Sequence, residues 1–345
     1  MNDPLHHTPL IITPLIITPG DPAGIGPEIA LKALANDSYL SAHTVLIGDR
    51  AHLGKLAQTL GLSVAFQKWT PGSPLYEDVI NLAEISWPAP VIAGKPDSAN
   101  APLIIQSIEI AAQLALQGDV KAIITCPIAK ANLYEAGFTY PGHTEFLGAL
   151  SGGKTPLMML ANKTLRVVPA TIHIPIARVS NALTQEGLSS LIQGVTQALQ
   201  HDFGLSQPRI AICGLNPHAG ENGAMGDEEI TTIAPAIAGA QQTLGKSAVI
   251  EGPVAADSLF HSDKITHYDC VIGMYHDQVL IPVKTIDFHG TVNITLGLDF
   301  IRTSPDHGTA FDIAGRNLAR PDSLINALML AEQMANHRVT SQNVK

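Results

Sequence analysis

The stretch LIITPGDPAGIGPEIA, residues 15–30, decides the fold. It joins a short apolar run rich in β-branched residues to a turn with three glycines, and then to a helical pattern. Pro27 lies in the first turn of the expected helix and Glu28 lies at the positive end of its dipole, as is usual where a helix begins. This order of strand, turn and helix predicts the first unit of a parallel sheet.

The same alternation continues along the chain. Apolar runs predict strands at 15–18, 44–48, 120–125, 166–173, 209–214 and 268–276. Helical patterns occupy the segments between them, from about 27, near 51–60, at 101–117, around 184–201 and from about 226 to 244. The pattern at 101–117 is the longest, and Gly118 ends it. We therefore predict an α/β protein with a mostly parallel sheet.

The composition excludes several classes of protein. The 345 residues exceed what one hydrophobic core usually holds, so we expect two lobes or one large α/β domain, and no Gly/Ser-rich or Pro-rich linker separates two halves. A net charge of −10 without a Lys/Arg cluster argues against nucleic-acid binding. The low charged fraction, 14%, fits either a homo-oligomer with an apolar interface or a large buried sheet.

The cysteines and the N-terminal residues point to a cytoplasmic protein. Cys126, Cys213 and Cys270 are far apart and lack CxxC spacing, so we expect buried reduced thiols rather than disulfides or a thiolate zinc site. The N-terminus lacks a basic segment and is broken by prolines, and no run of about 18 apolar residues occurs elsewhere, so neither a signal peptide nor a spanning helix is expected.

The hexapeptide PLIITP occurs twice, at 9–14 and 14–19. We interpret the second copy as the first strand of the sheet and the first copy as a dispensable extension. The alternative is a duplication without function.

Three expected strands each lead to a histidine. His173 and His276 end the apolar segments 166–173 and 268–276, and His218 follows the strand at 209–214 within LNPHAGENG. Because the carboxyl ends of parallel strands lie on one rim, these imidazoles can converge as the three protein ligands of a catalytic divalent metal. Nitrogen ligands suit zinc and admit cobalt or manganese. The alternative is that some of the 14 histidines lie at strand ends by chance.

Carboxylates lie near these histidines. Asp277 follows His276 and Asp257 lies in GPVAADSLF, so either could orient an imidazole or accept a proton, unless both only cap helices or face solvent. Four acidic residues after His218 are interpreted as capping the next helix and interacting with its dipole, rather than as catalytic groups: Glu221, Asp227, Glu228 and Glu229.

Few positive groups are near the expected rim. Lys130, Lys284 and Arg302, with Asn293, could bind a phosphate and a carboxylate, the alternative being solvated surface residues. The glycines of the first turn allow an anion to approach a helix N-terminus, although their spacing does not match G-x-G-x-x-G.

Five ordered motifs resemble the 4-hydroxythreonine-4-phosphate dehydrogenase family of pyridoxal phosphate synthesis. They are GDPAGIGPE (20–28), YPGHTEF (140–146), LNPHAGENGAMGDEE (215–229), MYHDQ (274–278) and NITLGLDFIRTSPDHGTAFDIAG (293–315). The resemblance runs from about residue 16 to about 335. The first motif and HGTAFDIAG are also similar to segments of the isocitrate and isopropylmalate dehydrogenases, which bind NAD without a Rossmann fingerprint. Two positions depart from the family pattern: Asp299 stands where the family usually has proline, and Pro305 precedes Asp306. Both concern local loop geometry rather than a residue mapped as a ligand.

The resemblance implies a fold and a reaction. The fold would be a three-layer α/β/α arrangement of two lobes that share a mostly parallel sheet with a cleft between them: a cofactor-side lobe of 1–134 plus 300–345, and a substrate, metal and dimerisation lobe of 135–299. The reaction would be oxidation of 4-(phosphooxy)-L-threonine at C3 by NAD, or NADP, followed by decarboxylation to 3-amino-2-oxopropyl phosphate, with zinc, magnesium or cobalt polarising the hydroxyl and the ketone. The enzyme would be a cytoplasmic homodimer.

The resemblance also implies site residues, with both subunits contributing to one site. The metal ligands would be His173, His218 and His276. The substrate would contact His143, Thr144, Lys284, Asn293 and Arg302, and the alcohol proton would go to Lys284, Asp257 or Asp277. The adenosine end of the cofactor would contact the loop 306–315 through Asp306, His307, Gly308, Thr309, Ala310, Asp312 and Gly315. The alternatives are a paralogue acting on D-threonate or D-erythronate 4-phosphate, and a metal-dependent hydrolase; a non-enzymatic binding module fits poorly.

Overall fold

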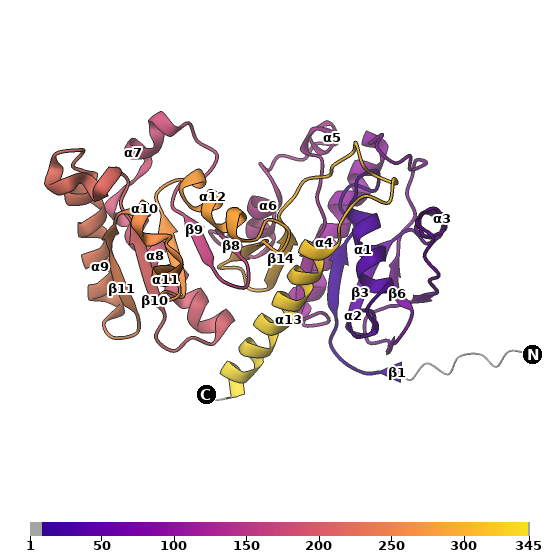
Figure 1. Ribbon diagram of the computed structural model, residues 1–345. Helices are drawn as coiled ribbons and strands as arrows, with labels where there is room; N and C mark the ends of the chain where they lie inside the picture. Colours follow the sequence, from indigo (N-terminus) through magenta and orange to yellow (C-terminus); the bar gives the residue numbers. More distant parts are fainter. Residues whose placement is uncertain (1–8, 344–345) are drawn as a thin grey trace, which may run out of the picture. The chain divides into compact units, whose positions relative to one another are not determined.

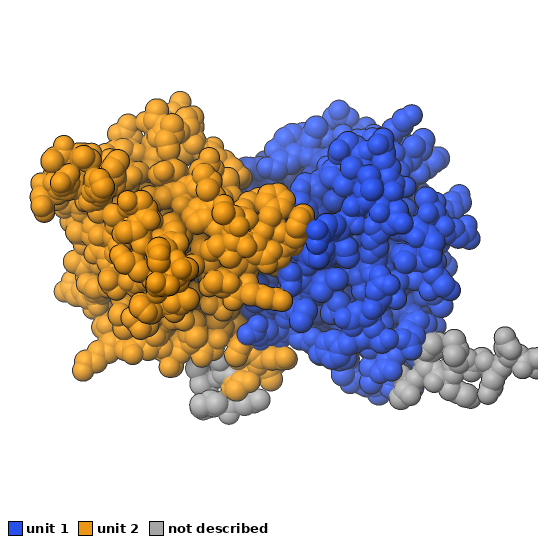
Figure 2. Space-filling model, in the orientation of Figure 1, with its two compact units in different colours: residues 1–155, 298–335 blue, residues 156–297, 336–345 orange. Residues whose placement is uncertain are grey.

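The computed structural model describes residues 9–343 (Figure 1), which divide into two compact units (Figure 2). Unit 1 comprises residues 9–155 and 298–335, and unit 2 comprises residues 156–297 and 336–343. Residues 135–155, which the family resemblance assigned to the second lobe, group with unit 1. The reason is that α6 (His143–Leu150) buries Phe146 and Leu147 in the core of unit 1.

Unit 1 holds six parallel strands in the order β14-β7-β2-β3-β6-β4. These are β14 (Ile301–Pro305), β7 (Ala122–Thr125), β2 (Leu15–Thr18), β3 (Thr44–Gly48), β6 (Ile80–Glu84) and β4 (Phe66–Lys68). On β2, Ile16 contributes to one core cluster, while Leu15 and Ile17, which face the opposite side, are also fully buried. Both faces are therefore covered, as in a three-layer α/β/α fold.

The helices of unit 1 occupy the connections between these strands. They are α1 (Gly26–Ala35), α2 (Ser38–His43), α3 (Arg50–Leu60), η1 (Ser98–Asn100), α4 (Ala101–Gln117), α5 (Lys130–Glu135) and α6. Helix α13 (Asp322–Asn343) follows β14, and its residues up to 335 belong to unit 1. Asp49 caps α3 by accepting a hydrogen bond from His52, and the left-handed Gly61 and Gly118 end α3 and α4. These local signals explain why the predicted βα alternation is confirmed.

Helix α4 is the candidate that could be mistaken for a membrane span. By length and composition alone, Ser98–Gln117 is long and apolar enough to cross a membrane. The expectation that no helix of the chain would meet this criterion is therefore wrong. That expectation required an unbroken apolar run, whereas mean hydropathy tolerates the polar residues within α4. The match is weak evidence, because Ile104, Ile108 and Ala111 pack into the core of unit 1, as in the core helix of a soluble protein.

Unit 2 holds six strands, in the order β11-β10-β12-β9-β8-β13. These are β11 (Val249–Val254), β10 (Arg209–Cys213), β12 (Cys270–Gly273), β9 (Arg166–Pro169), β8 (Leu157–Ala161) and β13 (Val292–Leu296). The first four pair in parallel, while β8 pairs antiparallel with both β9 and β13. The prediction of an α/β protein with a mostly parallel sheet is confirmed.

The helical segments of unit 2 are more irregular. They are η2 (Ile176–Arg178), α7 (Val179–Ala182), α8 (Gln185–Phe203), η3 (Pro217–Gly223), the π-helix η4 (Glu229–Ile233), α9 (Ala234–Leu244), α10 (Ala256–Leu259), α11 (Ser262–Ile265) and α12 (His276–Ile286). The helix expected from about 226 begins at Glu229, as a single π turn that leads into α9.

Three further expectations have clear outcomes. The three cysteines are buried and free, which confirms the prediction of reduced thiols. The longest helices are α13 with 22 residues and α8 with 19, not α4 with 17, because their polar faces weaken the apolar pattern. The first copy of PLIITP is more than an extension, since Pro9–Leu10 form β1, which pairs antiparallel with β5 (Leu75–Tyr76).

Candidate functional site

Two of the three predicted metal ligands lie together in unit 2. His173 follows β9 and His276 begins α12, and their ring centroids are 5.9 Å apart with an angle of 41° between the rings. Both line a pocket of about 330 Å³ with Tyr275 and Asp277. His173 has a φ of 52°, an uncommon value for a residue with a side chain. Such strain is typical of functional positions.

Asp277 contacts the second of these histidines. Its Oδ1 lies 2.6 Å from Nδ1 of His276. A carboxylate on one ring nitrogen fixes the orientation of the imidazole and leaves the other nitrogen for a ligand. The arrangement thus suits a metal-binding imidazole.

The third predicted ligand, His218, lies in η3 and is not among the residues that line this pocket. The loop around it has left-handed backbone at five successive residues: His218, Ala219, Gly220, Glu221 and Asn222. For a residue with a Cβ this conformation costs about 1 kcal/mol or more. Contacts elsewhere must therefore stabilise the loop.

Asn216 and two glutamates provide these contacts. Glu229, which is buried, accepts hydrogen bonds from the backbone N (2.7 Å) and Nδ2 (3.0 Å) of Asn216. Glu228 accepts from Ser180 Oγ and Asn216 Nδ2, both at 2.7 Å, and these bonds lower the pKa of Glu228. Glu228 is the N-cap residue of η4 and Glu229 lies in its first turn, as expected, and both carboxylates also bind Asn216, the residue that leads into the His218 loop.

Within residues 9–343, no group of three or more His, Cys, Asp or Glu side chains is arranged to hold a metal ion. The pair His173 and His276 fits a divalent cation of the zinc type, but a catalytic zinc usually takes three protein ligands. One chain as described thus brings two of the expected ligands together.

The other unit 2 residues of the predicted site lie on three elements. Lys284 is on α12, with its Nζ 5.5 Å from the ring centroid of Phe288. Asn293 is on β13, and its buried Oδ1 has no hydrogen-bond partner among the described residues. Asp257 is exposed on α10, which packs against η3, the segment that carries His218.

Unit 1 contains a site suited to an anion at the start of α6. His143 and Thr144 form the first turn of this helix, and Gly142 at its N-cap has no side chain to bond the free backbone N–H groups. Helix N-termini with free amides bind phosphate and carboxylate groups well. Lys130 lies beside this turn: its Nζ would be 3.5 Å from a Cβ atom built on Gly142.

Arg302 on β14 supplies the buried charge of this site. Its Nε and Nη2 donate to Thr125 Oγ1, at 3.1 and 2.6 Å. Burial lowers the pKa of Arg302 to about 10, against an opposing effect of Glu145, so the guanidinium stays charged at neutral pH. Burial also holds the pKa of His143 well below its usual range, with further lowering by Arg302 and Lys130. The site therefore combines a cation with a neutral imidazole.

The predicted cofactor loop, residues 306–315, connects β14 to α13 in unit 1. At its start, the backbone N of Asp306 donates to Ser323 Oγ at 3.1 Å. Thr309 O accepts from the N of Ile25 at 3.0 Å, and a Cβ on Gly24 would lie 2.9 Å from the same oxygen. The GDPAGIGPE turn therefore packs against this loop, and only glycine permits such a close approach at residue 24.

The remaining loop residues are placed by local contacts. His307 Nδ1 lies 3.1 Å from Gly308 O, and Ala310 has a φ of 43°. Asp312 is exposed, whereas Gly315 is tied to Glu28, a buried carboxylate whose role sequence reasoning missed. No short-range signal could reveal it, since the two residues are 287 positions apart.

Asp299, which departs from the family pattern, is well accommodated. Its backbone N donates to Ser151 Oγ at 2.8 Å, a bond that proline could not make, and its carboxylate pairs with Lys154 at 3.1 Å.

Known proteins match most of this chain. Residues 41–331 match the family model of the "Pyridoxal phosphate biosynthetic protein PdxA". The chain is 48% identical over 326 residues to the 4-hydroxythreonine-4-phosphate dehydrogenase of Caulobacter vibrioides, covering 92% of this chain and 96% of that protein. The solved structure of the Klebsiella pneumoniae enzyme of the same name has a TM-score of 0.85 and 37% identity, covering 94% of this chain and 100% of that one. A terephthalate 1,2-cis-dihydrodioldehydrogenase from Burkholderia xenovorans has a TM-score of 0.65 and 29% identity, covering 93% and 98%. The chain belongs to the PdxA family.

Proposed function

We propose that the protein is a 4-hydroxythreonine-4-phosphate dehydrogenase of pyridoxal 5'-phosphate synthesis. It oxidises 4-(phosphooxy)-L-threonine at C3, and the product loses CO2 to give 3-amino-2-oxopropyl phosphate. The relative from Caulobacter vibrioides has this name, and the match to this chain covers 96% of its length. The observation that carries the proposal is the buried, charged Arg302 in a unit whose α6 begins with uncapped amides, because this combination suits a phosphorylated substrate.

The proposed substrate contacts are taken residue by residue from the family resemblance. His143, Thr144 and Arg302 would bind the phosphate, with the guanidinium supplying charge and the neutral imidazole a hydrogen bond. Asn293, whose buried Oδ1 lacks a partner among the described residues, would accept a hydrogen bond from a polar group of the substrate. Lys284, Asp257 and Asp277 are the candidates to accept the alcohol proton.

The loop 306–315 would bind NAD, or NADP, through Asp306, His307, Gly308, Thr309, Ala310, Asp312 and Gly315. When bound, the nicotinamide supplies the hydride acceptor. The fit rests on a loop that is irregular yet tied at Asp306, Thr309 and Gly315 to neighbouring elements, which gives a ligand a prearranged backbone.

His173, His218 and His276 would hold zinc, magnesium or cobalt. A divalent cation supplies Lewis-acid chemistry when bound. Asp277 would orient His276, and the contacts of Asn216 would hold the His218 loop. Since one chain brings two of these imidazoles together, we propose that the third comes from a second copy in a cytoplasmic homodimer. On this proposal unit 1 carries the cofactor loop, and unit 2 carries the metal ligands and the dimer contacts.

The decisive experiment measures kcat/KM for three substrates with equal NAD and metal. We expect 4-(phosphooxy)-L-threonine to be turned over faster than D-threonate or D-erythronate 4-phosphate, with NADH formed in each turnover. Higher kcat/KM for either of the other phosphates would assign the chain to a paralogous dehydrogenase. Metal-dependent phosphate release without nicotinamide would favour a hydrolase instead.

A further inference from the structure

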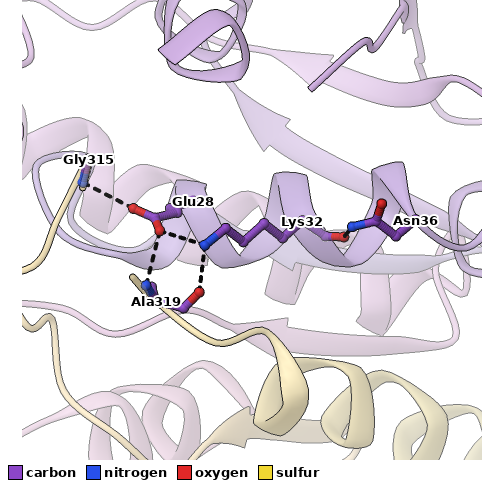
Figure 3. Close-up of polar contacts among 5 residues, drawn as sticks. All are labelled: Glu28, Lys32, Asn36, Gly315 and Ala319. Atoms are coloured by element: carbon purple, nitrogen blue, oxygen red, sulfur yellow. Dashed lines mark hydrogen bonds and ion pairs between the residues drawn. The ribbon is translucent and has the colours of Figure 1, made fainter. Parts of the chain in front are cut away.

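Glu28, on the first turn of α1, is a buried carboxylate that the proposed reaction does not use. Its side chain has a relative exposure of 1%, and it bonds to two backbone amides of the segment 306–320 (Figure 3). Oε2 accepts from Gly315 N at 3.0 Å, and Oε1 accepts from Ala319 N at 3.1 Å. The two oxygens of one carboxylate therefore hold two points of the segment, four residues apart.

Lys32, one helical turn later, completes the arrangement. Its Nζ donates to Glu28 Oε1 at 2.8 Å and to Ala319 O at 2.7 Å (Figure 3). Lys32 thus neutralises the buried carboxylate of Glu28. It also binds the carbonyl of Ala319, while Glu28 binds the amide of the same residue. A charge-assisted network of this kind is stronger than bonds between neutral groups.

The loop is fixed from the other side as well. Gly315 has a φ of 71°, and a Cβ there would lie 2.8 Å from that of Ala93. Gly94 donates its N–H to Ala23 O, and a Cβ on Gly94 would lie 2.7 Å from Phe311 O. Between these contacts the loop has no regular secondary structure of its own, so its shape depends on the groups that bind it.

From these contacts we infer that Glu28 is a positioning residue for the binding of NAD by this loop. It holds the 306–320 loop in the arrangement that accepts the cofactor without touching the cofactor itself, and Lys32 supports it. The inference rests on the proposed function, in which this loop binds NAD. The expected effect of losing Glu28 depends on the fraction of molecules whose loop has the native arrangement. If that fraction falls to about one tenth, the apparent dissociation constant for NAD rises about tenfold.

The test compares Glu28→Gln with Glu332→Gln. Glu332 on α13 is a matched control, since it is also a poorly exposed glutamate of unit 1 that pairs with a lysine. It accepts hydrogen bonds from Lys121 Nζ at 2.7 Å and from Tyr39 OH at 2.9 Å. Three measurements are made on the wild type and both variants: the Kd for NADH by fluorescence titration, steady-state kinetics, and hydrogen–deuterium exchange of peptides that span 306–320.

For Glu28→Gln we expect the Kd for NADH and the KM for NAD to rise about tenfold, because the glutamine keeps one acceptor and loses the charge that binds Lys32. The kcat at saturating NAD and the KM for the phosphorylated substrate should stay within about twofold of the wild-type values, since NAD at saturation restores the loop. The 306–320 amides should exchange faster than in the wild type. Glu332→Gln should leave all of these values unchanged.

Equal NADH affinity and equal loop exchange in the two variants would overturn the inference. If Glu28→Gln does not fold, Lys32→Met compared with Lys121→Met decides by the same measurements. A wild-type protein that binds no NADH would overturn the proposed function, and with it the role in cofactor binding.

Discussion

Arg302 and His143 show how the same effect of burial leaves one base charged and the other neutral. Burial lowers the pKa of both, but Arg302 starts so high that a value of about 10 leaves it charged, whereas His143 is held neutral. An anion near both groups meets one fixed positive charge and one imidazole that can donate or accept a hydrogen bond. The sequence predicted both residues through the family resemblance, but their protonation depends on burial, which no local pattern contains.

The stability of the protein should depend on His143 in mildly acidic solution. Because its folded pKa lies below the unfolded value near 6.5, the stabilisation is complete above that value and is lost as pH falls through the folded pKa. One such group changes the free energy of unfolding by at most about 1.4 kcal/mol per pH unit. Urea denaturation between pH 7.5 and 5 should show a smaller loss for His143→Gln than for the wild type. Equal slopes would mean that this ring titrates normally.

At the scale of elements, strands and regular helices could be predicted, and irregular segments could not. The apolar runs of β2 and β3 and the capping residues of α3 are local signals, and local signals decided those elements. The left-handed turn of η3 opposes the propensity of its own residues and exists because Glu229, 13 residues after Asn216, binds that asparagine. Likewise two amides of the loop 306–320 bind Glu28, a residue far from them along the chain.

Asn216→Ala should therefore loosen the His218 loop. The variant loses the Nδ2 bonds to Glu228 and Glu229 and leaves buried Glu229 with one acceptor unused, which costs about 1–3 kcal/mol of unfolding free energy. If His218 binds the metal, zinc affinity should fall about 10- to 100-fold, measured by competition with a chromogenic chelator.

Gln200→Ala is the control for this variant. It removes the side-chain bond to Ser247 O, at 2.9 Å, elsewhere in unit 2. Unchanged zinc affinity in Asn216→Ala would separate the His218 loop from metal binding.

At the scale of the whole molecule, the α/β class and the family could be predicted, but the completeness of the metal site could not. Strand order places three histidines at one rim, yet a rim does not fix where the following loops turn. His173 and His276 meet, and His218 is not part of any group of three metal-binding side chains in residues 9–343. Whether one chain or two supply all the metal ligands depends on the backbone conformation of the loops and on subunit assembly. The spacing of residues along a sequence encodes neither.

If a second copy supplies the third imidazole, metal binding and dimerisation are coupled, and the coupling must be reciprocal. Removing the metal with a chelator should then raise the dimer dissociation constant, and dilution to monomer should weaken zinc binding by the same factor. Sedimentation velocity across a dilution series, with and without chelator, measures the first effect. A dissociation constant unaffected by chelation would show that the metal is held within one subunit.

The buried thiols have a practical consequence. Cys126, Cys213 and Cys270 are inaccessible, and burial raises the pKa of each to about 12, so almost no thiolate is present near neutral pH. Maleimide dyes react with thiolates, so we expect the native cysteines of the folded protein to react very slowly with them, and none needs to be removed before labelling. A single cysteine introduced on the surface can carry a fluorophore alone, while slow modification of the native three reports on global opening of the chain.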